Sequence, residues 1–419
     1  MKLAKIIMHR IGRIVLPVAV GLVSVCLHGQ IPEGPPTAVM PSFSQDYQVS
    51  PIPGQPAMPS STQPMPPPSP FQYGPLSLEP SLSYQYLYET GVQAAPGVAA
   101  DMTTQSVTAG IVAQAGTNWN LSYSATWRDY SSALFHEGWD QTASFGGNFS
   151  YQDWSYQISQ TYSNTADPQI ETGAQTPEQS YGTNLAVTYG VGSSQPSLEM
   201  DFSQNILFAP FSPTIYTWSN QDWAHFPLSP QVDFAIGPGF GYTHEDPGFD
   251  MNYIRPQTKI DWRVSTKLSL SAQVGIEEDH YLSASPETTH SLVFSTDFSF
   301  QLSPTTTLGA GASRQVAPSI ITNDVTESTS FNVQASQRLL THFYLSVQAG
   351  SGKSTYLSTN SALADVRSDT TNSLQASLST MVLQRLNLSL TAARTHNSSS
   401  VQGFGLSSNQ FGFQAALKF

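Results

Sequence analysis

The sequence has few charged residues, a single cysteine and, beyond its N-terminal segment, no long hydrophobic run. Only 11% of its 419 residues are charged, against about 25% in ordinary domains. With 16 Lys and Arg against 29 Asp and Glu, the net charge is -13, so no basic stripe exists to displace counterions from nucleic-acid phosphates. Cys26 alone cannot form an internal disulfide. Nucleic-acid binding and a disulfide framework are therefore excluded.

The composition is that of a β protein whose polar residues are mostly uncharged. The chain contains 21 Phe, 18 Tyr and 7 Trp. Aromatic residues without continuous hydrophobicity suit the interfacial girdles of a membrane β-barrel. They suit a sugar-binding β protein equally, so composition leaves both classes open.

Residues 1–29 have the layout of a secretory signal peptide. An apolar run over residues 14–27 follows four cations, Lys2, Lys5, Arg10 and Arg13. The run is too short, and flanked by charge on one side only, for a stable spanning helix. We expect export with cleavage of this segment; lipidation of Cys26 is the alternative, although Val25 stands where a lipoprotein motif has a small residue.

Residues 30–75 are dominated by Pro, Ser, Gln and Met. Proline removes backbone donors and fixes φ, so this stretch can neither pair in a sheet nor continue a helix. We predict a disordered periplasmic linker, with partner binding by its proline cluster as the alternative.

From residue 76 to residue 419, segments of about ten to thirteen residues alternate apolar with polar or small side chains, which is the period of a strand. Clear examples are residues 197–208, 267–277 and 291–302. Short turns and longer links separate the segments alternately, and the longer links are predicted to begin near residues 94, 131, 164, 209, 245, 279, 316, 352 and 397. Counted from a first strand at residues 81–90, they predict about eighteen strands; sixteen or twenty also fit, because residues 214–226 alternate poorly. An even count with short turns at one end is typical of outer-membrane barrels.

The last eleven residues, 409–419, carry the most specific pattern. Alternate positions form an apolar row that ends on the C-terminal aromatic residue: Phe411, Phe413, Ala415, Leu417 and Phe419. This ending resembles the final strand of bacterial outer-membrane β-barrel proteins, and the chain looks most like the β-barrel porin type of Gram-negative bacteria. The resemblance implies an all-β, transmembrane, antiparallel up-and-down barrel over residues 76–419, surrounded by outer-membrane lipids. It also implies a signal for the barrel assembly machinery at Phe411, Phe413, Leu417 and Phe419. Porins often form trimers, so a homo-oligomer stays open.

The same period assigns side chains to faces. Leu198, Met200 and Phe202 would point outward, and Glu199 and Asp201 inward, because a charged side chain facing hydrocarbon costs about 2–4 kcal/mol. With both charge signs inside, we expect weak ion selectivity. The predicted pore-lining residues are Glu199, Asp201, Asp233, Lys259, Asp261, Arg263, Glu277, Asp297 and Arg338.

Apparent active-site motifs are weak. Residues 350–355 resemble a phosphate-binding loop, but Val347 stands where glycine is required. We expect two acid and histidine groups in loops: His244, Glu245, Asp246 and Asp250, then Glu277, Glu278, Asp279 and His280. Neither has a nucleophile or a metal-binding spacing. The sequence therefore predicts no enzyme, cofactor or metal site, with loop-bound calcium as the alternative.

The predicted function is passive diffusion of small hydrophilic solutes through a porin-like channel. A barrel that secretes exopolysaccharide, or one that is plugged and structural, is an alternative of the same architecture. A secreted soluble adhesin or glycan-binding protein is an alternative of another class.

Overall fold

The computed structural model describes residues 71–419 except 191–194, 211, 283–286, 322, 341, 359–363 and 383–384. The predicted signal peptide, Cys26 and the predicted linker up to residue 70 lie outside the described residues. The prediction that residues 30–75 do not pair in a sheet was wrong at their end, where the short strand β1 (Phe71–Tyr73), which contains no proline, pairs with the beginning of β2.

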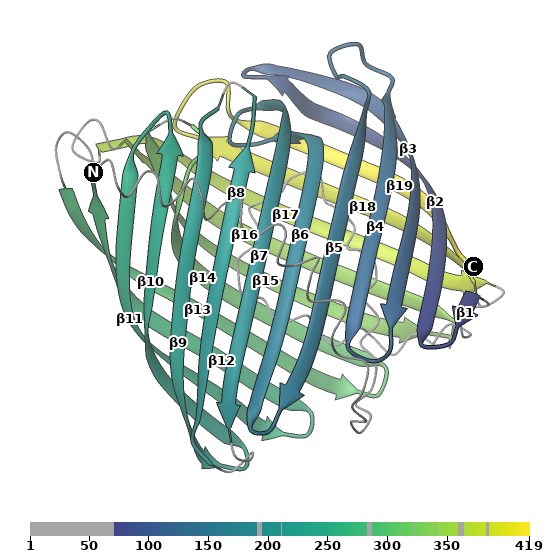
Figure 1. Cartoon of the computed structure of the whole chain (residues 1–419). Helices are drawn as coiled ribbons and strands as arrows, with labels where there is room; N and C mark the ends of the chain where they lie inside the picture. Colours follow the sequence, from purple (N-terminus) through teal and green to yellow (C-terminus); the bar gives the residue numbers. More distant parts are fainter. Residues whose placement is uncertain are drawn as a thin grey trace. The chain divides into compact units, whose positions relative to one another are not determined.

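Eighteen long strands, β2 to β19, follow β1 (Figure 1). Their bounds are β2 (Leu76–Ala95), β3 (Val98–Ala115), β4 (Trp119–Tyr130), β5 (Gly138–Tyr151), β6 (Trp154–Gln169), β7 (Ala174–Gly190), β8 (Ser197–Phe208), β9 (Thr214–Ser229), β10 (Val232–Asp246), β11 (Asp250–Ser265), β12 (Leu268–Tyr281), β13 (Glu287–Ser303), β14 (Thr306–Pro318), β15 (Asp324–Leu339), β16 (Phe343–Ser358), β17 (Ala364–Val382), β18 (Leu386–Ser399) and β19 (Leu406–Lys418). Among the described residues, no helix is long and apolar enough to cross a membrane.

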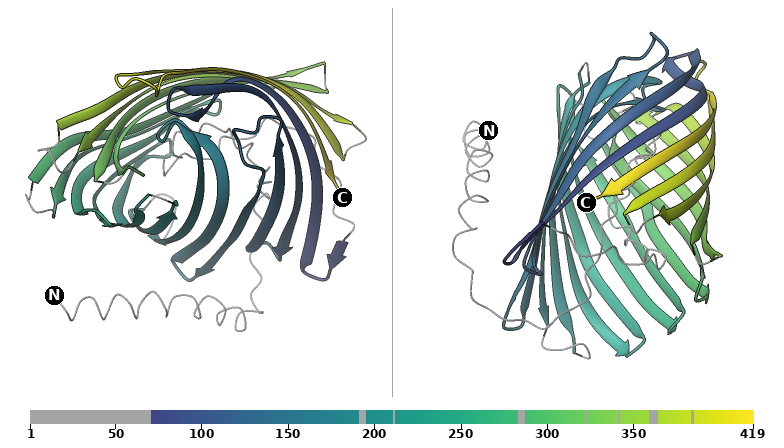
Figure 2. Two further views of the ribbon diagram at one scale, coloured as in Figure 1. Left: turned by 90° about the horizontal axis from the view of Figure 1, so that it is seen from above. Right: turned by 90° about the vertical axis from the view of Figure 1, so that its right-hand side faces the viewer.

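The sheet closes on itself. Each long strand pairs antiparallel with the next, and β19 pairs with β2, where Phe413 lies opposite Tyr86. In the side view of Figure 2 the C-terminal strands cross in front of the more distant strands at a steep angle, as tilted barrel strands do. The prediction of an antiparallel barrel of about eighteen strands is confirmed.

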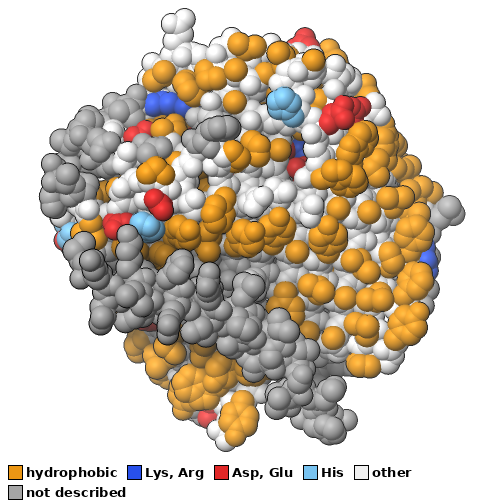
Figure 3. Space-filling model, turned by 45° about the horizontal axis from the view of Figure 1, so that its top comes forward, with side chains coloured by type: hydrophobic (Ala, Val, Ile, Leu, Met, Phe, Trp, Pro, Cys, Tyr) orange, Lys and Arg blue, Asp and Glu red, His pale blue; other side chains and the backbone are white. Residues whose placement is uncertain are grey.

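The distribution of side chains is the reverse of that in a soluble protein. Leu198 of β8 is 53% exposed, and Met200 and Phe202 are exposed with it, as the alternation predicts. Figure 3 shows hydrophobic side chains spread over the described surface. The fully buried side chains, in contrast, include Glu245, Glu277, Asp279 and Asn397. Apolar residues therefore cover the exterior, and polar groups face the interior.

The short turns lie at the end of the barrel that holds β1 and Phe419, called the turn end here; the opposite end is the loop end. The short turns agree with the prediction, and most of the longer links begin within about three residues of the predicted positions, but two links were predicted to begin too early. β6 continues to Gln169 and β16 to Ser358, whereas links were expected near Asn164 and Gly352. Near a wet interior, polar residues can extend the backbone pairing of a strand without alternating with apolar residues. The ends of such strands therefore have no hydrophobic signal in the sequence.

The irregular part of β9 and β10 explains the run of glycines in β10. Pairing passes from Ile236–Ala224 to Gly239–Gln221, so Gly237 and Pro238 are skipped. Pro238 has no N–H to donate. A Cβ atom on Gly237 would lie 1.6 Å from the Asp222 carbonyl oxygen. Only glycine fits this close backbone approach.

Two hairpins leave the wall at the loop end. β14 pairs with β13 only as far as Arg314, opposite Phe294. Beyond that point the β14–β15 hairpin packs against β11 and β12, where Val325 is fully buried with Phe249, Met251 and Tyr281. The β6–β7 hairpin contacts β2, which is not its neighbour in the sheet. Both hairpins therefore fold across the inside of the barrel.

Candidate functional site

The tips of the two hairpins form the candidate site. The first tip is residues 170–173, between β6 and β7, and the second tip is residues 319–321 and 323, between β14 and β15. Glu171 of the first tip accepts hydrogen bonds from the Ser319 hydroxyl and, at 3.1 Å, from the Ile320 N–H. Asn323 of the second tip donates its N–H to Glu245 on β10 at 2.9 Å. The two tips thus meet each other and are tied to the wall.

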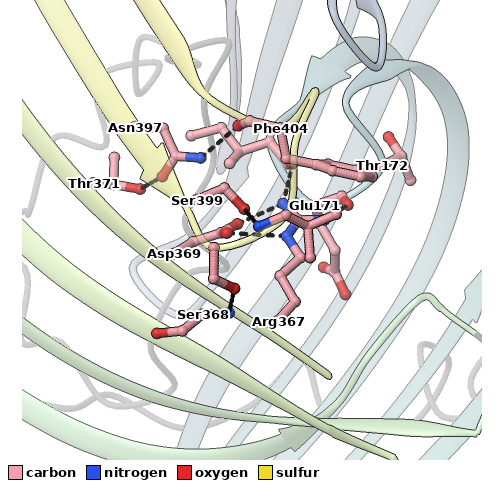
Figure 4. Close-up of polar contacts among 12 residues, drawn as sticks. Glu171, Thr172, Arg367, Ser368, Asp369, Thr371, Asn397, Ser399 and Phe404 are labelled. Carbon is pink, nitrogen blue, oxygen red and sulfur yellow. Dashed lines mark hydrogen bonds and ion pairs between the residues drawn. The ribbon is translucent and has the colours of Figure 1, made fainter. Parts of the chain in front are cut away.

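Arg367 of β17 lies at the centre of the contacts that hold the first tip (Figure 4). It pairs with Asp369, with Nε to Oδ1 at 3.0 Å and Nη2 to Oδ2 at 2.5 Å, and their side chains are only 5% and 3% exposed. Alternate residues of a strand point to the same face, so this pair forms within one strand. The guanidinium also lies over the Phe404 ring, 3.8 Å from its centroid. The guanidinium group is planar, and its contacts with Asp369 and Phe404 fix its position. Its remaining N–H groups therefore point in a fixed direction.

Those N–H groups hold the backbone of the first tip. Arg367 donates from Nη1 to the Glu171 carbonyl at 2.7 Å and from Nη2 to the Ile170 carbonyl at 2.9 Å. Hydrogen bonds to a charged group contribute about 1.5–3 kcal/mol each. β17 and β6 are far apart around the sheet, so these bonds span the interior. We call the contacts among Arg367, Asp369, Glu171 and Ser319 the latch.

The link between β18 and β19 positions Phe404 for the latch. Asn397, which is almost completely buried, accepts from the Thr371 hydroxyl and donates to the Phe404 carbonyl, both at 2.8 Å. Gly403 accepts from the Gly97 N–H at 2.7 Å. The backbone around the aromatic ring is therefore held by the Asn397 side chain of β18 and by Gly97 of the β2–β3 link.

Glu171 is the titratable group of the latch outside the strands. Burial raises the pKa of its carboxyl group, and the hydrogen bonds from Ser319 and Ile320 and the charge of Arg367 oppose that rise. The carboxyl group therefore binds its proton more tightly when the tip is in place than when it is exposed to water.

Five of the residues predicted to line a pore lie together on β8, β10 and β11: Glu199, Asp201, Asp233, Lys259 and Asp261. His225 of β9 joins them, with Nε2 2.9 Å from Glu199 and Nδ1 2.6 Å from Asp233. Lys259 pairs with Asp261 at 3.1 Å. An imidazole between two carboxylates can donate to both only when it is protonated. His225 was not predicted to join them, because β9 alternates poorly and its two faces could not be assigned from the sequence.

The remaining predicted residues are spread along the wall. Glu277 is only 1% exposed and accepts from Arg255 Nε at 2.6 Å. Asp297 on β13 is half-buried. Arg263 and Arg338 line a cavity at the turn end.

The expectation that the two acid and histidine groups lie in loops was wrong for all of their members, since Asp250 begins β11. Residues 277–280 belong to β12 and residues 244–246 to β10. Glu277 and Asp279 point inward, whereas Glu278 and His280 are partly exposed on the other face. A polar interior accepts charges within strands, so charge density alone did not locate the loops. Among the described residues, no group of three or more His, Cys, Asp or Glu side chains is placed to hold a metal ion.

The latch was not predicted from the sequence, and neither was a second set of buried ion pairs. Arg128 of β4 pairs with Asp140 at 2.7 Å and also with Asp167. For the latch, the available signal in the sequence was the period of the strand, which places Arg367 and Asp369 on one face. Nothing in the sequence indicated that this face would meet a hairpin tip.

No protein-family model and no curated protein matches the sequence. Among solved structures, the chain is similar to Pseudomonas aeruginosa OpdK crystallised with vanillate, with 12% identity, a TM-score of 0.45, and coverage of 82% of this chain and 99% of that chain. It is similar to Acinetobacter baumannii OccAB2, with 9% identity, a TM-score of 0.47 and coverage of 82% and 98%. It is also similar to the siderophore receptor PirA from Pseudomonas aeruginosa, with 10% identity, a TM-score of 0.42 and coverage of 85% and 81%. At these values the likenesses add nothing to the closed barrel that the strand pairing defines.

Proposed function

We propose that the chain is an integral outer-membrane barrel that lets small hydrophilic solutes diffuse through its interior. The observation that carries this proposal is the reversed distribution of side chains: exposed Leu198, Met200 and Phe202 outside, and buried Glu277 and Asp279 inside. Lipid would solvate the apolar exterior. Closure of the sheet pairs every strand edge, which a backbone inside hydrocarbon requires. A barrel of this width leaves room for a polar channel.

In this proposal the predicted pore-lining residues set selectivity. Glu199, Asp201, Asp233, Lys259 and Asp261 combine both charge signs on one stretch of wall, which favours weak discrimination between small ions. The two tips narrow the loop end, so the channel admits small solutes only. The apolar row at Phe411, Phe413, Leu417 and Phe419 is proposed as the signal for the barrel assembly machinery.

Two measurements on the purified full chain test the proposal. A folded transmembrane barrel should migrate differently on a gel before and after heating, and it should produce discrete single-channel currents in a planar lipid bilayer. Heat-dependent migration without currents would support the plugged structural barrel. Extraction into buffer without detergent would overturn the membrane proposal and support a soluble β-rich protein.

A further inference from the structure

A cavity at the turn end of the inner wall collects positive charge. Its volume is about 390 Å³, within the range of small-molecule sites. Arg263 of β11, Lys267 of the following turn and Arg338 of β15 line it, and no Asp or Glu of the described residues does. In a chain with a net charge of -13, three cations around one cavity need an explanation.

These three cations have no carboxylate partner among the described residues. Of the nine other Lys and Arg residues in the described part of the chain, five do have one: Arg128, Arg255, Lys259, Arg314 and Arg367 each pair with Asp or Glu. The nearest acid on β11, Asp261, is occupied by Lys259 at 3.1 Å. The cavity therefore keeps an uncompensated positive charge.

The wall between the two arginines consists of hydrogen-bonding side chains. Arg263 lies opposite Ser269, which lies opposite Ser299. Thr307 lies opposite Ser336, and Arg338 opposite Tyr344. Four hydroxyl groups thus separate Arg263 from Arg338 along the sheet, and each can donate a hydrogen bond. Guanidinium groups at both sides with hydroxyl donors between them match the acceptors of an oxyanion.

We propose that this cavity binds a carboxylate or phosphate group of a small solute at the turn end of the channel. The inference rests on the proposed function and deepens it, because it gives the solute a charged group. The remainder of the wall carries both charge signs, whereas the described charged residues that line this cavity are all cations. A positively charged cavity raises the local concentration of anions and retains them before release.

The test uses the full-length protein in a planar bilayer and in detergent, with inorganic phosphate and citrate as probes. Phosphate or citrate should interrupt the single-channel current and should bind in titration calorimetry. The double variant R263Q/R338Q should weaken both effects by about tenfold or more, since each lost charged hydrogen bond is a large share of a weak affinity. R385Q is the matched control, because Arg385 lies at another turn of the same end and does not line the cavity. It should leave both effects within about twofold.

The outcomes separate the two proposals. A channel that conducts but whose wild type neither binds nor is blocked by the probes overturns the anion site alone. Probe binding without any current overturns the channel and keeps the site. Equal weakening by R385Q would show a general effect of net charge and would also overturn the site. If the double variant fails to show heat-dependent migration, the single variants R338Q and K267Q replace it.

Discussion

At the scale of the residue, Arg367 holds the first tip in place at the loop end of the barrel. R367Q removes the two hydrogen bonds to the first tip and leaves Asp369 buried without its partner, which costs about 3–5 kcal/mol. We expect a larger single-channel conductance and a lower unfolding temperature. R367Q/D369N removes the same bonds without leaving a lone buried charge, so it should raise the conductance equally and destabilise the fold less. Unchanged conductance in both variants would mean that the first tip does not restrict the channel.

Glu171 makes the same contact dependent on pH. The pKa of Glu171 is raised when the tip is in place. The protein therefore binds this proton more tightly with the tip in place than with the tip released. The stabilisation is therefore fully present at acidic pH, below the ordinary pKa, and is lost as pH rises through the raised pKa. We expect conductance to increase with pH over that interval. E171Q keeps an oxygen acceptor for Ser319 and Ile320 but cannot titrate, and an identical pH dependence in that variant would contradict this role.

At the scale of the strand, the break in the pairing of β9 and β10 depends on Gly237. In G237A the new Cβ would meet the Asp222 carbonyl at 1.6 Å, and backbone atoms rather than a flexible side chain would have to move. We expect a loss of about 1–3 kcal/mol in the free energy of unfolding, measured as the denaturant midpoint of heat-dependent gel migration. G352A is the control, since its nearest neighbour is 3.7 Å away. A similar loss in both variants would indicate a general effect of alanine in the strands.

The strands also show what the sequence could predict. Period-2 alternation and turn residues predicted the barrel, its strand count and the outward row of Leu198, Met200 and Phe202, because a face against an apolar medium imposes a local pattern. The latch has no such signal. Glu171 and Ser319 are 148 residues apart, and their contact depends on two hairpins leaving the wall. Inside this barrel, buried polar pairs take the place of an apolar core, and only an apolar core would have left a hydrophobic pattern in the sequence.

At the scale of the whole molecule, the medium around the barrel decides between a membrane channel and a soluble protein. Val333 of β15 is exposed, whereas the next residue, Gln334, lies on the inner face. In lipid vesicles, V333R should reduce the free energy of unfolding by about 2–4 kcal/mol if Val333 lies near the bilayer midplane. Q334R should change it little, because an arginine on the wet face keeps its hydration. A soluble protein would show the opposite order, since arginine in place of an exposed valine is nearly neutral in water while an inward arginine must be accommodated. The sign of this difference therefore reports whether hydrocarbon or water covers the exterior.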